Sequence, residues 1–224
     1  MAEKVFIEGY TGTGKSYSLR NLDPNKTFII QVVKKMFPFK GGKSKYKLIT
    51  KENPHGNLAR CKDYSGITKI LKYVNSQRPE IEVIILDDIH YVITKDYMKR
   101  IPDKEAKGDT YKKFGEMAYN FDFLLNIAED LRDDLYIFFL AHTQVNSDGS
   151  RSFKTIGKML DEKIVLEGLV SIVLESKRRE DKYVFQTNLS DSSEPCKSPY
   201  GMFEELYIDN DLNEVLNKIK EFNE

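Results

Sequence analysis

Hydrophobic positions along the chain follow two alternating patterns. Apolar residues recur at helical spacing in three stripes, within residues 67–74, 114–128 and 212–219. Four short and almost unbroken apolar runs predict β-strands covered on both faces, at Val5–Glu8, Thr27–Val33, Val83–Leu86 and Leu135–Ala141. Because strands and helices alternate, the sequence predicts an α/β fold with a mostly parallel sheet flanked by helices.

The chain reads as a single domain over residues 1–224, since it contains no internal repeat and no long linker. Residues 34–80 between the second and third strands are too many for one helix and predict a small insertion, within which Ser65 is the expected N-cap of a helix. After the fourth strand, two β-rich segments predict a hairpin at the sheet edge; they are Ile164–Glu175 and Lys182–Thr187, around the polar turn Ser176–Asp181.

A glycine-rich loop follows the first predicted strand. Its residues fit the phosphate-binding pattern G-x-x-x-x-G-K-[ST] at every position, and they are Gly9, Tyr10, Thr11, Gly12, Thr13, Gly14, Lys15 and Ser16, with Tyr17 next. We expect this segment to bind ATP, with Lys15 reaching the β- and γ-phosphates and the Ser16 hydroxyl ligating Mg²⁺. A helix beginning at Ser16 would point its positive end at the phosphates. The alternative is a chance glycine-rich turn.

Two carboxylates end the third predicted strand. Asp87 is expected to hold Mg²⁺ through its water shell. Asp88 either polarises the attacking water or caps the next loop. At the end of the fourth strand, His142 and Gln144 are candidate sensors of the γ-phosphate, although a histidine at a strand end is more often structural.

With these pieces in order, the chain resembles RecA/KaiC-like core ATPases. More narrowly, it resembles phage-encoded nucleotide-binding proteins of the AAA-domain type, some of which are RecA-like single-strand annealing proteins. The narrow match rests on Leu86–Tyr91, Lys154–Lys163 and Lys197–Phe203. The resemblance implies a RecA-like P-loop core, ATP hydrolysis with Mg²⁺, and action on single-stranded DNA in phage recombination. A single-strand-binding protein is a further candidate partner.

The resemblance extends to the last hairpin. Lys177 and Arg179 match the Lys-x-Arg that enters the neighbouring subunit's ATP site in RecA-type ATPases, which implies a ring or filament. A solvated hairpin tip is the alternative. One departure stands out, because RecA-type enzymes carry a catalytic glutamate soon after the second core strand. Here Lys34–Lys40 contains no carboxylate and the next is Glu52, which predicts weak hydrolysis or assigns the base to Asp88.

Charge is balanced overall and uneven locally. The 35 Lys and Arg residues equal the 35 Asp and Glu residues, so a uniformly basic DNA coat is excluded. Basic stretches with interleaved aromatic residues predict contacts with single-stranded DNA, or alternatively solvated loops; they are Lys34–Lys51, Thr94–Lys113 and Val145–Lys158. Residues 204–224 form an acidic, helical C-terminal segment that either lies on the surface, competes with DNA or contacts a partner.

Composition suggests a cytoplasmic location, which would be the host cytoplasm for a phage-encoded protein. The two cysteines have no metal-binding spacing, no apolar run is long enough to span a membrane, and the N-terminal residues do not resemble a secretory signal. Two other functions stay open: a P-loop nucleotide or nucleoside kinase, and a non-enzymatic, ATP-gated scaffold for a replication or packaging partner.

Overall fold

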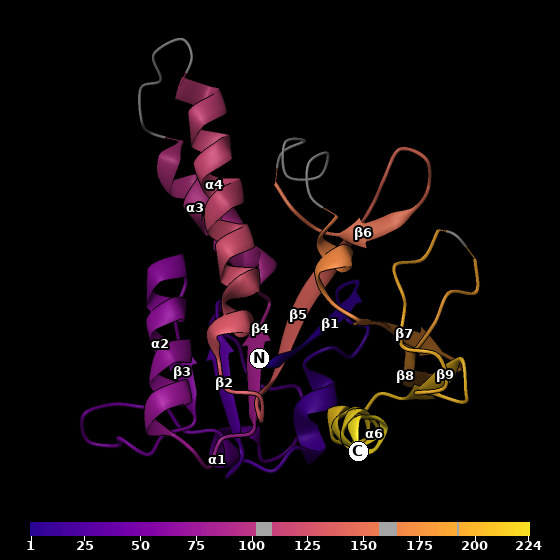
Figure 1. Cartoon of the computed structure of the whole chain (residues 1–224), viewed down its shortest axis with the longest axis horizontal. Helices are drawn as coiled ribbons and strands as arrows, with labels where there is room; N and C mark the ends of the chain where they lie inside the picture. The colour runs from indigo at the N-terminus through magenta and orange to yellow at the C-terminus, as the bar shows by residue number, and fades with distance from the viewer. Residues whose placement is uncertain (102–108, 157–164, 192) are drawn as a thin grey trace.

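A twisted sheet forms the centre of the protein, whose computed structural model describes residues 1–101, 109–156, 165–191 and 193–224 (Figure 1). The strand order is β3-β2-β4-β5-β1-β7-β8-β9, with β6 paired to the end of β5. Pairing is parallel from β3 to β7 and antiparallel from β7 to β9. The strands are β1 (Glu3–Gly9), β2 (Thr27–Gln31), β3 (Leu58–Arg60), β4 (Val83–Asp87), β5 (Tyr136–Val145), β6 (Arg151–Phe153), β7 (Ile172–Arg179), β8 (Lys182–Gln186) and β9 (Tyr207–Asp209).

Helices cover both faces of this sheet. The α-helices are α1 (Gly42–Lys45), α2 (Tyr64–Gln77), α3 (His90–Arg100), α4 (Asp109–Asn126) and α6 (Leu212–Asn223). Short 3-10 helices are η1 (Tyr17–Asn21), η2 (Ile127–Asp130) and η3 (Leu166–Leu169). In Figure 1, α3 and α4 project beyond the sheet at the end where the parallel strands finish. None of the described helices is long and apolar enough to cross a lipid bilayer.

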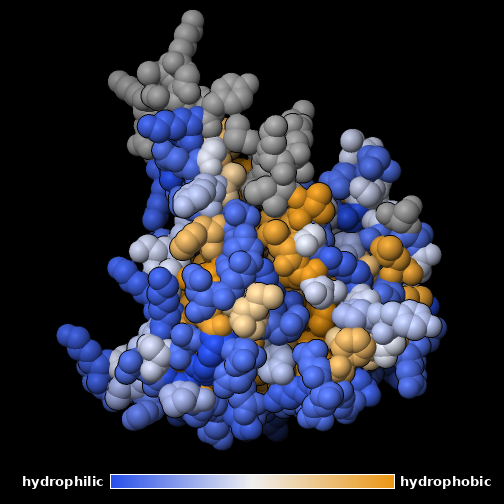
Figure 2. Space-filling model, viewed as in Figure 1, coloured by the Kyte–Doolittle hydropathy of each residue, from blue (hydrophilic) through white to orange (hydrophobic). Residues whose placement is uncertain are grey.

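Alternating strand residues build two separate cores. On β2, Phe28 and Ile30 belong to the core beneath α2, α3 and α4, whereas Ile29 belongs to the core beneath η1 and α6. Burial of successive residues on opposite faces explains why the strand sequences are continuously apolar. Figure 2 shows that one face of the molecule is mainly hydrophilic, with hydrophobic side chains gathered near its centre.

The α/β class, the mostly parallel sheet and the flanking helices are confirmed. The predicted insertion contributes β3 to the sheet edge and α2 to one face. The final hairpin turns more tightly than predicted, because Glu180 and Asp181 both adopt left-handed φ angles of 47° and 64° and let β7 run on to Arg179. The acidic segment 204–224 forms β9 and α6, and α6 buries one apolar face against the sheet.

The N-cap predicted for α2 is wrong by two residues. Asp63, not Ser65, occupies the cap position, and its carboxylate accepts a hydrogen bond of 2.8 Å from the Gly66 amide. A carboxylate at this position also interacts favourably with the positive end of the helix.

We therefore expect Asp63→Ala to lower the free energy of unfolding by about 1 kcal/mol, because it removes the cap. Ser65→Ala is the matched control, since Ser65 lies within the helix on an exposed position, and it should change stability little. Urea unfolding followed by circular dichroism measures both. Equal losses in the two variants would contradict the assignment of the cap.

Candidate functional site: a phosphate-type loop facing two aspartates

The loop of residues 9–16 connects β1 to η1 and packs against the β7–β8 hairpin. Gly9 has a φ of 153°, and a Cβ there would lie 2.6 Å from the Ser176 carbonyl oxygen. Gly14 has a φ of 106°, and a Cβ there would lie 2.9 Å from the Tyr183 ring. The Ser176 hydroxyl also donates to the Thr13 carbonyl at 2.7 Å. Both glycines are therefore required by the backbone conformation and by close packing.

Lys15 is folded over this loop. Its ammonium donates to the carbonyl oxygens of Gly9 at 2.6 Å and Tyr10 at 2.8 Å. Burial lowers the pKa of Lys15 to about 8, against the opposing effect of Asp88. Among the described residues, the ammonium thus has only neutral carbonyl partners at hydrogen-bond distance, and an anion in the loop would give it a charged one.

The helix expected after the loop is much shorter than predicted. Residues Tyr17–Asn21 form one 3-10 turn, and Leu22 already returns to an extended conformation with a ψ of 142°. The positive end of a long helix is therefore not available here, so an anion bound in the loop would depend on the loop's own amides.

Other loop residues are held within the chain. The Thr13 hydroxyl donates to the Tyr10 carbonyl at 2.9 Å, while the Tyr10 ring is exposed. The Thr11 hydroxyl oxygen lies 3.4 Å from Nδ1 of His142. Tyr17 packs on Tyr183 and so adds to the contact between the loop and the final hairpin.

The two segments with the strongest sequence signals meet at one hydrogen bond. The Ser16 hydroxyl donates to Oδ1 of Asp87 at 3.0 Å. Asp87 is 1% exposed, and its other oxygen, Oδ2, has no hydrogen-bond partner in the part of the chain that the structure describes. Burial raises the pKa of Asp87, with Lys35 acting in the opposite direction. A hydroxyl beside an orphaned carboxylate oxygen is a donor set that fits Mg²⁺.

Lys35 is the residue at this site that the sequence reasoning did not single out. It follows β2, and its ammonium lies 3.2 Å from Oδ1 of Asp87 and 2.6 Å from Oδ2 of Asp88. Burial opposes its charge, but the two carboxylates outweigh burial and raise the pKa of Lys35. The available signal was a lysine at the strand end where RecA-type enzymes carry a glutamate.

Asp88 begins the connection to α3 in a left-handed conformation, with a φ of 59° that is unusual outside glycine. Its Oδ1 lies 3.6 Å from Nε2 of His142. His90 completes the group, since one ligand atom each from Asp88, His90 and His142 lies within 4.8 Å of the others. Both imidazoles stay neutral near pH 7, because burial lowers the pKa of His90 to about 3 and that of His142 to about 4.

The register of β5 places His142 and Gln144 at different distances from the loop. His142 is paired with Gly9, the first residue of the loop, and so lies at the site. Gln144 lies two residues farther along β5, where it pairs with Ser152 of β6. The structure therefore brings His142, but not Gln144, into contact with Thr11 and Asp88.

Lys177 and Arg179, the candidates for entering a neighbouring subunit's ATP site, have partners within their own chain. The Lys177 ammonium lies 3.1 Å from Oε2 of Glu175 and 2.7 Å from Oε1 of Glu194. The Arg179 guanidinium stacks 3.9 Å from the centre of the Tyr207 ring. Lys177 would have to leave two ion pairs to enter a neighbouring subunit, whereas Arg179 would give up its cation–π contact with Tyr207.

Two of the aromatic residues within the basic stretches lie in the interior. Phe153 is 2% exposed and packs on Phe6 and Phe121. Tyr46 is 2% exposed and packs on Phe37. Their apolar rings contribute to the two cores, so their role as stacking platforms is wrong.

The basic stretches are also divided between the two ends of the sheet. Residues 43–57 approach the start of β2, where the Asn57 amide donates to the Pro24 carbonyl at 2.7 Å and to the Lys45 carbonyl at 3.2 Å. The start of β2 lies at the end of the sheet opposite loop 9–16. Arg151 is committed to Glu175 and Glu194, each at 3.0 Å. Lys104, Lys107, Lys158 and most of the Lys154–Lys163 segment lie outside the described residues.

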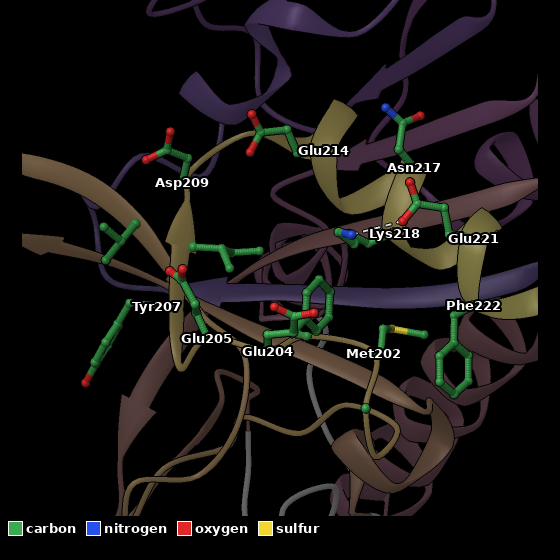
Figure 3. Close-up of a pocket in the computed structure, with 14 residues that line it drawn as sticks. Met202, Glu204, Glu205, Tyr207, Asp209, Glu214, Asn217, Lys218, Glu221 and Phe222 are labelled. Carbon is green, nitrogen blue, oxygen red and sulfur yellow. Dashed lines mark hydrogen bonds and ion pairs between the residues drawn. The ribbon is translucent and has the colours of Figure 1, made fainter.

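A groove of about 810 Å³ lies between β9 and α6, and none of residues 9–16 lines it (Figure 3). Phe203 and Phe222 line it together with acidic side chains; these are Glu204, Glu205, Asp209, Glu214 and Glu221. Lys218 is paired with Glu221 at 2.9 Å. The groove is therefore acidic and would repel nucleic-acid phosphates.

No protein-family model matches the chain, and no curated protein is significantly similar to it in sequence. Functional inference therefore rests on the geometry around Lys15, Ser16, Asp87 and Asp88.

Protonation of the buried histidines should make stability depend on pH. The pKa of His142 falls from 6.5 to about 4 on folding, so the unfolded chain binds more protons between these values. The free energy of unfolding should decrease as the pH falls through this window.

We expect His142→Gln to lessen that decrease by roughly 1–3 kcal/mol. The control is His55→Gln at an exposed position, which should leave the pH profile unchanged. Chemical unfolding at a series of pH values measures this, and identical profiles for all three proteins would contradict it.

Proposed function

We propose that the chain is an ATP-binding, Mg²⁺-dependent ATPase of the RecA-like P-loop class. The observation that carries the proposal is the hydrogen bond between Ser16 and Asp87, which places the end of the G-x-x-x-x-G-K-S loop against the carboxylate of β4. The strand order supports the RecA-like core, because β5 separates β1 from β4 and brings His142 between them.

The residues present suggest a division of labour. Bound Mg²⁺ would supply positive charge to the β- and γ-phosphates. Ser16 and Asp87 would hold the ion, while Lys15 would move from the Gly9 and Tyr10 carbonyls to the phosphates. His142, neutral and next to Thr11, would face the terminal phosphate as a hydrogen-bonding sensor.

Slow hydrolysis follows from the state of the proposed base. Asp88 is held in an ion pair with Lys35 at 2.6 Å, so its carboxylate would have to release the ammonium before it could contact an attacking water. ATP would then act mainly by setting the assembly state and the affinity for a partner. This consequence also keeps the ATP-gated scaffold as a second candidate function.

The proposed nucleic-acid partner is single-stranded DNA, bound at the end of the sheet that carries the loop. Exposed lysines in the described residues of that end include Lys99 on α3, Lys112 on α4 and Lys154 after β6. The carboxylates of the groove between β9 and α6 would repel the DNA phosphates from that surface, which favours binding at the end that carries the loop. Assembly through Arg179 into a ring or filament belongs to the same proposal, as does recruitment of a single-strand-binding protein.

Lys15→Ala tests the nucleotide site. Removing the ammonium should weaken ATP binding on the order of 100-fold, because charge-assisted hydrogen bonds to phosphate are lost. Lys47→Ala changes an exposed lysine near the opposite edge and should bind like the wild type. Calorimetric titration with ATP and Mg²⁺ gives the affinities, and circular dichroism checks folding. Wild-type affinity in Lys15→Ala, or transfer of phosphate to added nucleosides, would refute the proposal.

Charge reversal tests the DNA surface. The double variant Lys99→Glu, Lys112→Glu should weaken binding of a labelled single-stranded oligonucleotide and flatten its salt dependence, by about 0.7 in the log–log slope per lost phosphate contact. The matched control is Lys43→Glu, Lys47→Glu on the opposite side of the sheet. Fluorescence anisotropy at several salt concentrations measures both. If only the control pair weakens binding, DNA lies on the other edge.

A further inference from the structure

Lys35 is held in place rather than left on a loose loop. The Gln31 side-chain amide donates to the Lys35 carbonyl at 3.3 Å, and the Val32 amide donates to the Asp87 carbonyl at 3.2 Å. These bonds continue the β2–β4 contact beyond the end of β2. The lysine is thereby aimed at the two carboxylates that follow β4.

Its ammonium already neutralises the group that would hold a divalent ion. Oδ1 of Asp87 accepts the Ser16 hydroxyl at 3.0 Å and lies 3.2 Å from the Lys35 ammonium. Any cation approaching this oxygen must share it with Lys35 or displace Lys35. The site thus contains two lysines, Lys15 and Lys35, beside two aspartates, Asp87 and Asp88, so the formal charges of these four groups cancel.

The two lysines also act within one electrostatic field. The charge of Lys35 contributes to lowering the pKa of Lys15. The Lys15 side chain is buried, and that of Lys35 is half-buried. A triphosphate entering the loop would therefore meet two cations supplied by the chain. In this respect the site differs from one in which a carboxylate occupies the end of β2 and a divalent ion must supply the second positive charge.

We propose that Lys35 is a built-in cation of the nucleotide site, which takes over part of the charge of the divalent ion and makes triphosphate binding depend only weakly on Mg²⁺. The inference rests on the proposed function, since it concerns the same loop. It predicts that Mg²⁺ is needed for hydrolysis much more than for binding.

Calorimetric titration with a non-hydrolysable ATP analogue, in Mg²⁺ and in EDTA, tests the role of Lys35. Removing Mg²⁺ should weaken wild-type binding by less than about threefold, and binding by Lys35→Met by more than about tenfold. Lys34→Met is the matched control, because Lys34 is the exposed neighbour, and it should behave like the wild type. Lys35→Arg keeps the charge and should also do so. A wild-type loss above tenfold, equal to that of Lys35→Met, would overturn the proposal.

A second measurement needs no nucleotide. Mg²⁺ alone should raise the melting temperature of Lys35→Met, whose aspartates are free to bind it, and leave that of the wild type and Lys34→Met unchanged. If the analogue binds to none of the proteins, the proposed function fails while this result still decides the role of Lys35. Equal Mg²⁺ stabilisation of all the proteins would refute that role. If Lys35→Met does not fold, Lys35→Gln replaces it in both measurements.

Discussion

The contact between Ser16 and Asp87 is the constraint on which the rest of the site depends. It joins segments 71 positions apart in sequence and fixes how the loop after β1 faces the end of β4. Parallel pairing through β5 makes the contact possible, because it brings the ends of the three strands to one edge. Once that edge is formed, Lys15, Asp88 and His142 lie together at it, held by the contacts of Lys35 with Asp88 and of Ser176 with the loop.

Electrostatics at this edge is balanced by the protein itself. Buried aspartates are costly unless they are paired, and Lys35 supplies the pairing charge. Lys15 meanwhile satisfies its donors with the loop carbonyls of Gly9 and Tyr10. Both lysines therefore lie close to the place where a phosphate would bind. On binding, phosphate oxygens would replace their present carbonyl and carboxylate partners, and no further cationic side chain would have to move in.

The sequence was informative wherever a local pattern decided the structure. Continuous apolar runs located the core strands, and the glycine spacing located a loop that does need Gly9 and Gly14 in left-handed conformations. It was less informative where distant residues decide the outcome. The ion pairs of Lys35 depend on the β2–β4 register, and the burial of Phe153 depends on helix α4 above it. A charged or aromatic residue in a predicted loop therefore could not be assigned to solvent, core or site by spacing alone.

The most direct test of the account is a crystal structure of the chain with a non-hydrolysable ATP analogue and Mg²⁺. We predict that the triphosphate lies within loop 9–16, that the Lys15 ammonium has left the Gly9 and Tyr10 carbonyls for phosphate oxygens, and that the ion is held beside Ser16 and Asp87. An analogue bound elsewhere, or a loop in which Lys15 keeps its carbonyl partners, would contradict the account.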